Sequence, residues 1–451
     1  MEESSKVLEG PIVSTFFRYL IPSLVGLLAL TSANIVDGIF IGNYVGVEAL
    51  ASVNLIVPIM SLLFGVGLML SIGGSVRGGK YLGEKDAAAA SAIFSKTMIA
   101  VALYGVSTIG LGLVFERSLF AALGATEEVV PLMSRYYRII MPFLFAHLVT
   151  IVLYFFLRLD NSPKLSAFAL VFGSAVNIAL DYVFIARLDW GIAGAGYATG
   201  ISQTVAMLVL MSYFLRKRRQ FRFRLFQRDW LEVFKAGYNG LSEFVGEISQ
   251  GLVALLFNWM LITRVGVEGV AAITVVNYLL MIGFMVFFSI GDTSQVMVSQ
   301  NYGARNYFRI RKFISIAESL VLLVSLACVV MILVKGESLV ALFLEEDMAA
   351  ESLELSMQFL GYIWPAYLVL GTNVLISSYL TAVHLPLQSG IVAVSRSLLL
   401  PGTFLLLFYK VLEGDRFVMA IPVAEGIALV IAGYLFVRNR PSRLRYDGDV
   451  R

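Results

Sequence analysis

Charged residues are scarce in this chain, and their scarcity is the first constraint on what it is. Only 14% of the 451 residues are Asp, Glu, Lys or Arg, whereas 59% are hydrophobic. Soluble chains average about 25% charged residues. The deficit extends along the whole sequence, which excludes a soluble domain carried on a single anchor. A mean hydropathy of +0.83 therefore indicates a membrane protein with many spans.

Residues that commonly build metal and catalytic sites are also nearly missing. The single Cys328 lies in the apolar run LVLLVSLACVVMILV, so a disulfide framework and a cysteine metal site are excluded. His147 and His384 are too few and too far apart for a zinc motif. The pattern GSVRGGK at 74–80 precedes Tyr81, where a phosphate-binding loop needs Ser or Thr. H-E-x-x-H and G-x-S-x-G do not occur. We expect no enzyme and no cofactor beyond a coupling ion.

Long apolar runs make up most of what is present. They are continuous stretches of about 20 residues, which predicts membrane helices and excludes the alternating strands of an outer-membrane barrel. The sequence predicts an all-α polytopic protein with twelve spans, near 12–36, 53–76, 92–114, 130–157, 165–186, 190–215, 233–262, 271–297, 313–335, 354–382, 387–411 and 418–438.

Lys and Arg are concentrated in alternate connections between these spans, and this bias predicts orientation. The even-numbered connections carry Arg77, Lys80, Lys85, Arg158, Lys164, the run RKRRQFRFRLFQRD at 216–229, Arg305, Arg309, Arg311 and Lys312. The odd-numbered ones carry fewer, and some are acidic, with Glu48, Glu337, Glu345, Glu346 and Asp347. We therefore expect a plasma-membrane protein with both termini cytoplasmic. Beside a membrane, the run at 216–229 indicates a topology signal that contacts anionic lipid, and no nucleic-acid partner is expected.

The sequence also repeats itself. GVEALAS at 46–52 matches GVEGVAA at 266–272, and ATGI at 198–201 matches AEGI at 424–427. Six spans per half preserve orientation, so the halves are predicted to be parallel repeats related by an axis along the membrane normal, a construction typical of secondary transporters. The predicted organisation is a six-helix bundle over 1–215, a basic cytoplasmic linker over 216–230, a second six-helix bundle over 231–440 and a cytoplasmic tail over 441–451.

Several acids lie inside or at the ends of these apolar spans. A charge at the centre of a membrane helix costs about 2.5–3.5 kcal/mol, so acids retained there are candidate functional groups. Asp37 is expected at the end of the first span and Asp292 at the end of the eighth, where either side chain could instead reach interfacial water. The others are Asp181 in the fifth span, Glu243 and Glu247 in the seventh, and Glu425 in the twelfth.

Asn177 and Asp181 are four residues apart, so they share one face of the fifth helix. A bound cation, or a proton shared between carboxylates, needs further oxygens from other helices. Asp37 is the candidate second carboxylate, and Thr199 in the sixth span is a candidate hydroxyl. These four residues are the predicted coupling site and the Na⁺ ligands if Na⁺ is used. The alternative for Asp181 is structural pairing alone.

The second half offers a possible further coupling or substrate site. Glu243 and Glu247 share a helix face, which fits either such a site or a solvated groove without function. Glu425 occupies the repeat position of Thr199. This difference reflects either divergence between the repeats or a second site in the C-terminal half. Arg396 falls at the repeat position of Asn177 and would neutralise a nearby acid.

Four segments resemble the multidrug and toxic compound extrusion (MATE) family: NIVDGIFIGNYVGVEALAS, NIALDYVFI, GIAGAGYATGISQ and GLSEFVGEIS. The resemblance covers nearly the whole chain and is nearest the bacterial and archaeal branches. It implies two six-helix bundles that export organic cations, often drugs, in exchange for Na⁺ or H⁺. It also implies a cation site at Asp37, Asn177, Asp181 and Thr199, with Glu247 as the seventh-span acid. Tyr182 and Ile151 depart from the family, because Pro and Asn often stand at these positions.

Three alternatives to a cation-coupled exporter remain open. A lipid-linked precursor flippase shares the superfamily architecture but would be expected to present cavity arginines to a pyrophosphate. A membrane-embedded enzyme lacks a recognisable catalytic set, and a channel or receptor leaves the repeated halves unexplained. The sequence specifies neither the substrate nor the choice between Na⁺ and H⁺, and we expect a monomer.

Overall fold

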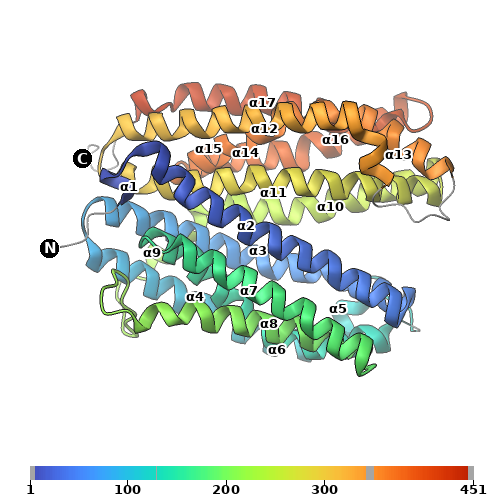
Figure 1. Cartoon of the computed structure of the whole chain (residues 1–451), viewed down its shortest axis with the longest axis horizontal. Coiled ribbons are helices and arrows are strands. Elements are labelled where there is room, and N and C mark those ends of the chain that lie inside the picture. Colours follow the sequence, from blue (N-terminus) through green and yellow to red (C-terminus); the bar gives the residue numbers. More distant parts are fainter. Residues whose placement is uncertain (1–5, 128, 342–349, 445–451) are drawn as a thin grey trace. The chain divides into compact units, whose positions relative to one another are not determined.

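The computed structural model describes residues 6–127, 129–341 and 350–444, and these residues form helices and turns without a strand (Figure 1). Within these described residues, twelve helical segments are long and apolar enough to cross a membrane. They are Ile12–Val45, Glu48–Gly83, Ala87–Val114, Val130–Leu159, Pro163–Arg187, Ile192–Leu215, Leu241–Arg264, Glu268–Gly303, Tyr307–Ala341, Leu353–Ala382, Pro386–Val411 and Arg416–Arg438. The predicted all-α fold with twelve spans is confirmed.

The chain divides into two compact units, Met1–Gly240 and Leu241–Arg451. The first contains α1 (Lys6–Glu9), α2 (Ile12–Phe40), η1 (Ile41–Val45), α3 (Val47–Gly83), α4 (Ala87–Val114), α5 (Glu116–Ala122), α6 (Val130–Leu159), α7 (Pro163–Asp181), η2 (Tyr182–Arg187), α8 (Ile192–Met211), η3 (Ser212–Leu215) and α9 (Leu231–Asn239). The second contains α10 (Leu241–Arg264), α11 (Val267–Gly303), α12 (Tyr307–Ala341), α13 (Ala350–Ile363), η4 (Trp364–Ala366), α14 (Tyr367–Ala382), α15 (Pro386–Val394), η5 (Ser395–Leu399), α16 (Leu400–Val411), η6 (Arg416–Met419), α17 (Ala420–Arg438) and η7 (Pro441–Arg443).

The two units repeat the same local structure. Helices α3 and α11 each have 37 residues, and the residues before them, Gly46 and Gly266, have φ angles of 115° and 93°. Only glycine adopts such angles without steric cost. The turns that follow these helices also match, since Lys85 and Arg305 have φ angles of 64° and 54°. The sequence repeat is therefore a repeat of helix lengths and turn conformations.

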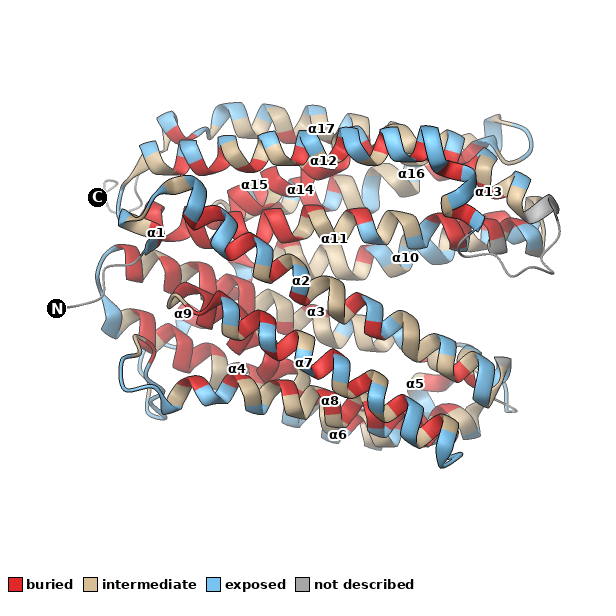
Figure 2. Cartoon of the chain, viewed as in Figure 1, coloured by how far each residue is buried: buried red, intermediate tan, exposed pale blue. Residues whose placement is uncertain are grey.

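Apolar side chains cover much of the outside of both units. On α12, Leu323, Leu333 and Val334 are each more than 60% exposed, and Figure 2 shows exposed residues along α12 and α17. Such surfaces are unfavourable in water, whereas they match the hydrocarbon of a bilayer. The described residues therefore form a multi-pass membrane protein.

Helix α9 packs with the first unit, whereas the sequence placed its residues in the C-terminal bundle that begins at 231. It lies against α3 and α4. A Cβ added at Gly73 of α3 would overlap the carbonyl oxygen of Ala236, and one added at Gly240 would overlap the carbonyl oxygen of Met69. The absence of side chains at both glycines lets the two backbones touch.

The helices extend beyond several predicted ends, and this changes the position of three acids. Because α2 continues to Phe40 and η1 to Val45, Asp37 lies inside the first span and not at its end. Asp292 likewise lies inside α11 and is only 3% exposed. The helix is interrupted at Gly240, so Glu243 lies in the first turn of α10 and not well inside a seventh span that begins near 233. The acidic connection at Glu345, Glu346 and Asp347 lies outside the described residues.

Candidate cation site

Asp37 and Asp181 meet inside the first unit. Helices α2 and α7 pack along each other, and the two carboxyl groups lie close enough to interact directly. Asp181 is fully buried, and Asp37 is half-buried. The structure thus brings together the two carboxylates that the sequence placed on different helices.

Among the residues that the structure describes, the pair has no basic partner. No described Lys, Arg or His forms an ion pair with Asp37 or Asp181. In the same part of the chain, no donor forms a hydrogen bond to either carboxylate oxygen of Asp181. Two adjacent carboxylates repel each other strongly in a poorly solvated site. Such a pair is stabilised when a proton or a metal cation lies between the oxygens.

Asn177 lies one turn before Asp181 on the same face of α7. It is only 6% exposed, and its Nδ2 lacks a hydrogen-bond partner among the described residues. A carboxamide with no fixed partner can turn its oxygen toward a cation that enters the site. Asn177 is therefore placed as a potential oxygen ligand beside the carboxyl pair.

Thr199 is less closely associated with the pair. It lies on α8, which packs against α6 and α7, and its side chain is half-buried. Its main-chain oxygen accepts a hydrogen bond from Ser202 Oγ at 2.8 Å, but within the described residues no hydrogen bond joins its hydroxyl to Asp37 or Asp181. Of the four predicted residues, the two acids meet, Asn177 lies one turn away, and Thr199 is on a neighbouring helix.

Tyr136 is a further member of the site that the sequence analysis missed. It lies on α6, is 7% exposed, and is within electrostatic range of both Asp37 and Asp181. Gly196 of α8 packs beside its ring. The phenol can donate a hydrogen bond to a carboxylate. No local signal marks this residue, because it is one of 20 tyrosines and lies in an ordinary apolar span.

Both acids lie near changes in helix geometry. The π-helical segment η2 begins at Tyr182, directly after Asp181, and η1 begins four residues after Asp37. Wide turns of this kind free main-chain groups and often occur at functional sites. At Tyr182 the helix continues as this π-helical segment.

The second unit contains an acid that is already neutralised. Glu425 accepts a hydrogen bond from Arg396 Nε at 3.1 Å and another from Asn373 Nδ2 at 2.7 Å. The side chains of Glu425 and Arg396 are 10% and 16% exposed. The equivalence of Arg396 and Asn177 in the repeat stays a prediction.

Glu243 extends this cluster. Gln295 Nε2 donates to its Oε1 at 3.4 Å, and Asp292, Glu247 and Arg396 lie within electrostatic range of Glu243. The four acids and one guanidinium therefore carry a net negative charge when all are ionised.

A metal ion at the first-unit pair would need ligands other than acids. The described residues contain no group of three or more His, Cys, Asp or Glu side chains that could hold a metal. Na⁺ takes oxygen ligands, and Asn177, Thr199 or main-chain carbonyls would have to complete its shell. Proton binding needs only the two carboxyl groups.

A family model described as MatE matches residues 22–183 and 244–403, one match in each unit. The chain belongs to the MatE family. This MatE protein is 25% identical over 430 residues to the probable multidrug resistance protein YoeA of Bacillus subtilis, covering 92% of each chain. It is 22% identical over 449 residues to the multidrug export protein MepA of Staphylococcus aureus strain MW2, covering 97% of this chain and 96% of the relative.

Solved structures share the fold. A MATE structure in complex with MaD3S has a TM-score of 0.91 and 24% identity, covering 98% of this MatE protein and 99% of that chain. A MOP superfamily transporter from Pyrococcus furiosus, described as having a binding pocket of reverse polarity, has a TM-score of 0.89 and 25% identity, covering 98% of each chain.

Proposed function

We propose that this protein is a secondary active antiporter that exports organic cations or drugs in exchange for Na⁺ or H⁺ by alternating access. The observation that carries the proposal is the pair of carboxyl groups, Asp37 and Asp181, held together inside membrane helices with no basic partner in the part of the chain that the structure describes. Membership of the MatE family supports the same activity, and so do the names of the relatives, a probable multidrug resistance protein and a multidrug export protein.

The pair provides a means of coupling. When Asp37 and Asp181 are both ionised, their repulsion favours separation of α2 and α7, and the negative charge favours an organic cation. A bound proton or Na⁺ removes the repulsion and lowers the attraction for that cation. A ligand shifts a conformational equilibrium only through such a difference in affinity between states. Ion loading would then promote substrate release, and ion release would restore the substrate-binding form.

Arg396 favours an exporter of cations over a flippase. A pyrophosphate-bearing lipid needs unneutralised guanidinium groups, and the Arg396 guanidinium is paired with Glu425 in the second unit. An enzyme is a weaker alternative, because the relatives are named as transporters. The Lys and Arg bias supports a plasma-membrane location with both termini cytoplasmic.

Efflux from proteoliposomes under separate Na⁺ and pH gradients tests the proposal. The double variant Asp37→Asn, Asp181→Asn is expected to lose gradient-driven efflux of a fluorescent organic cation, because neither carboxyl can then bind the coupling ion. The matched control is Asp189→Asn, the same change at an exposed acid after η2, which should keep normal efflux. Normal coupled efflux in the double variant would defeat the proposal. Loss of the ion gradient without substrate would instead indicate a channel.

A further inference from the structure

The basic linker between the units is docked on the first unit through its backbone. Ser91 and Ser95 are one turn apart on α4. Ser91 Oγ donates to the carbonyl oxygen of Gln220 at 2.9 Å and accepts from the Arg222 N–H at 3.2 Å. Ser95 Oγ accepts from the Arg224 N–H at 3.0 Å. The main chain of residues 220–224 is therefore fixed along α4.

An aromatic side chain anchors the same segment. Phe221 is fully buried, with its ring centroid 5.4 Å from that of Phe94 and 5.5 Å from that of Phe156. The Gln220 N–H donates to Asp160 Oδ2 at 3.0 Å. Phe221 is buried, whereas the next three residues, Arg222, Phe223 and Arg224, are exposed. The docking thus holds a row of guanidinium groups on the outer side.

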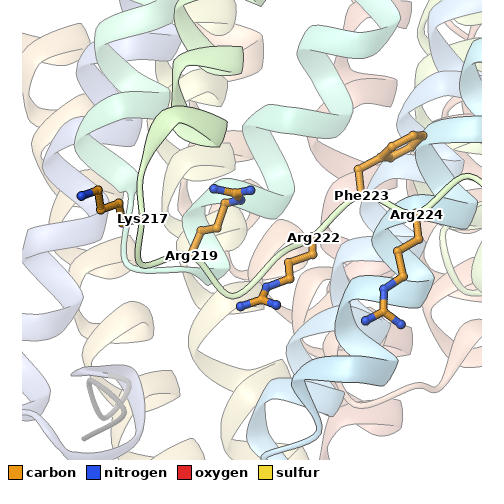
Figure 3. Close-up of a pocket in the computed structure, with 5 residues that line it drawn as sticks. All are labelled: Lys217, Arg219, Arg222, Phe223 and Arg224. Carbon is orange, nitrogen blue, oxygen red and sulfur yellow. The ribbon is translucent and has the colours of Figure 1, made fainter.

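These groups surround a pocket of about 360 Å³, lined by Lys217, Arg219, Arg222, Phe223 and Arg224 (Figure 3). In the part of the chain that the structure describes, none of the four basic side chains forms an ion pair with a carboxylate. Arg219 Nη1 donates to the main-chain oxygen of Arg216 at 2.7 Å, while its Nε is buried without a partner. Four positive charges that line one pocket, without an ion-pair partner among the described residues, attract an anion with several acceptor oxygens.

Apolar side chains next to the pocket indicate where that anion comes from. The linker begins directly after the span Ile192–Leu215. Phe223, Leu225 and Phe226 are 47%, 64% and 93% exposed. A soluble phosphate would gain nothing from these side chains, whereas acyl chains would cover them. We propose that the pocket binds the phosphate group of an anionic phospholipid, with Phe226 inserted among the acyl chains.

The test compares two pairs of arginines in the same linker, in the full-length protein. The variant Arg222→Gln, Arg224→Gln removes two pocket charges but no backbone contact to Ser91 or Ser95. The control variant Arg218→Gln, Arg228→Gln removes two exposed charges that do not line the pocket. Short-chain phosphatidylglycerol is titrated into each detergent-solubilised protein, and the rise in Tm gives the apparent Kd.

The pocket variant is expected to bind phosphatidylglycerol roughly 30-fold more weakly, since each basic residue near an anionic lipid contributes a factor of about five. The control variant should change less than threefold, and both should match the wild-type Tm without lipid. Inorganic phosphate at equal ionic strength should leave the wild-type Tm unchanged. Equally weakened phosphatidylglycerol binding in both variants would overturn the proposal that this pocket is the binding site. If inorganic phosphate raised the Tm of the wild type but not that of the pocket variant, the assignment of a lipid would be overturned.

Discussion

The ammonium group of Lys96 lies 2.6 Å from Oε2 of Glu232, and both residues are buried in the first unit. Tyr81 donates its hydroxyl hydrogen to the other carboxylate oxygen, and Arg77 Nε is 3.9 Å from that oxygen. This cluster joins α3 and α4 to α9. It holds α9 against α3 and α4 by electrostatic attraction, in addition to the backbone contacts at Gly73 and Gly240.

Replacing Glu232 with Gln should destabilise the first unit, because it leaves the Lys96 ammonium buried without a counter-charge. Loss of one partner of a buried pair costs about 3–5 kcal/mol. Denaturant unfolding in mild detergent would measure the change. The same substitution at the exposed Glu48 should cost less than about 1 kcal/mol. Adding Lys96→Met to Glu232→Gln should recover part of the loss, and a double variant as unstable as the single one would contradict this account.

Gly73→Ala should displace α9, because the new methyl group would overlap the main-chain oxygen of Ala236. Overpacking against a fixed backbone costs typically 1–3 kcal/mol. Faster trypsin cleavage within 216–229 would report the displacement. Gly110→Ala, where the space is open, should leave the cleavage rate unchanged. Equal cleavage rates for the two variants would show that the contact at Gly73 does not hold the linker.

Asn177→Ala should weaken Na⁺-driven efflux more than H⁺-driven efflux. An amide oxygen can coordinate a metal ion, but it does not accept a proton near neutral pH. We expect at least a tenfold rise in the Na⁺ concentration needed for half-maximal efflux if Na⁺ is used, with less than a twofold change under a pH gradient. Asp181→Asn is the comparison, since it should abolish both. An equal loss under both gradients would remove Asn177 from the ion site.

Arg396→Gln should be destabilising because it leaves the Glu425 carboxylate with Asn373 as its only remaining side-chain partner among the described residues. The double variant Arg396→Gln, Glu425→Gln should lose less than the sum of the single variants. A double-mutant cycle based on unfolding should give a coupling energy of about 1–3 kcal/mol. Strict additivity would mean that the observed ion pair contributes nothing to stability.

Topology can be tested with one engineered thiol. In a Cys328→Ala background, a cysteine replacing the exposed Arg218 should resist a membrane-impermeant maleimide in intact cells and react after permeabilisation. Cytoplasmic placement of the basic linker predicts this result. Strong labelling of intact cells would reverse the predicted orientation of the chain.

Hydropathy and self-comparison were sufficient to predict the fold. The number of spans follows from apolar length, and the repeat at 46–52 and 266–272 corresponds to turns at Gly46 and Gly266 with positive φ. Helix ends were less predictable. The stretch IGNYV looks like a loop because it contains Gly and Asn, yet it continues the first span as η1. Tertiary packing can override such local preferences.

The candidate site was only partly accessible from the sequence. Asp37 and Asp181 could be named because acids are rare and costly in membrane helices. Tyr136 could not be named, since an uncharged tyrosine in an apolar span does not carry the insertion cost of a charged residue. The docking of the linker was also hidden, because it depends on contacts made at long sequence separation: Ser91 and Ser95 bind the linker backbone, and the Phe221 ring packs on Phe94.

The docked linker leaves very few flexible residues in the connection between the two units. A free flexible chain of about 25 residues would have a root-mean-square span of about 25–30 Å. Here residues 220–224 are fixed along α4, and α9 is fixed on α3. The flexible part of the connection therefore shortens to the peptide link between Gly240 and Leu241. A protease cut near Arg228 would therefore leave α9, and the whole second unit that follows it, attached to the first unit without a covalent bond.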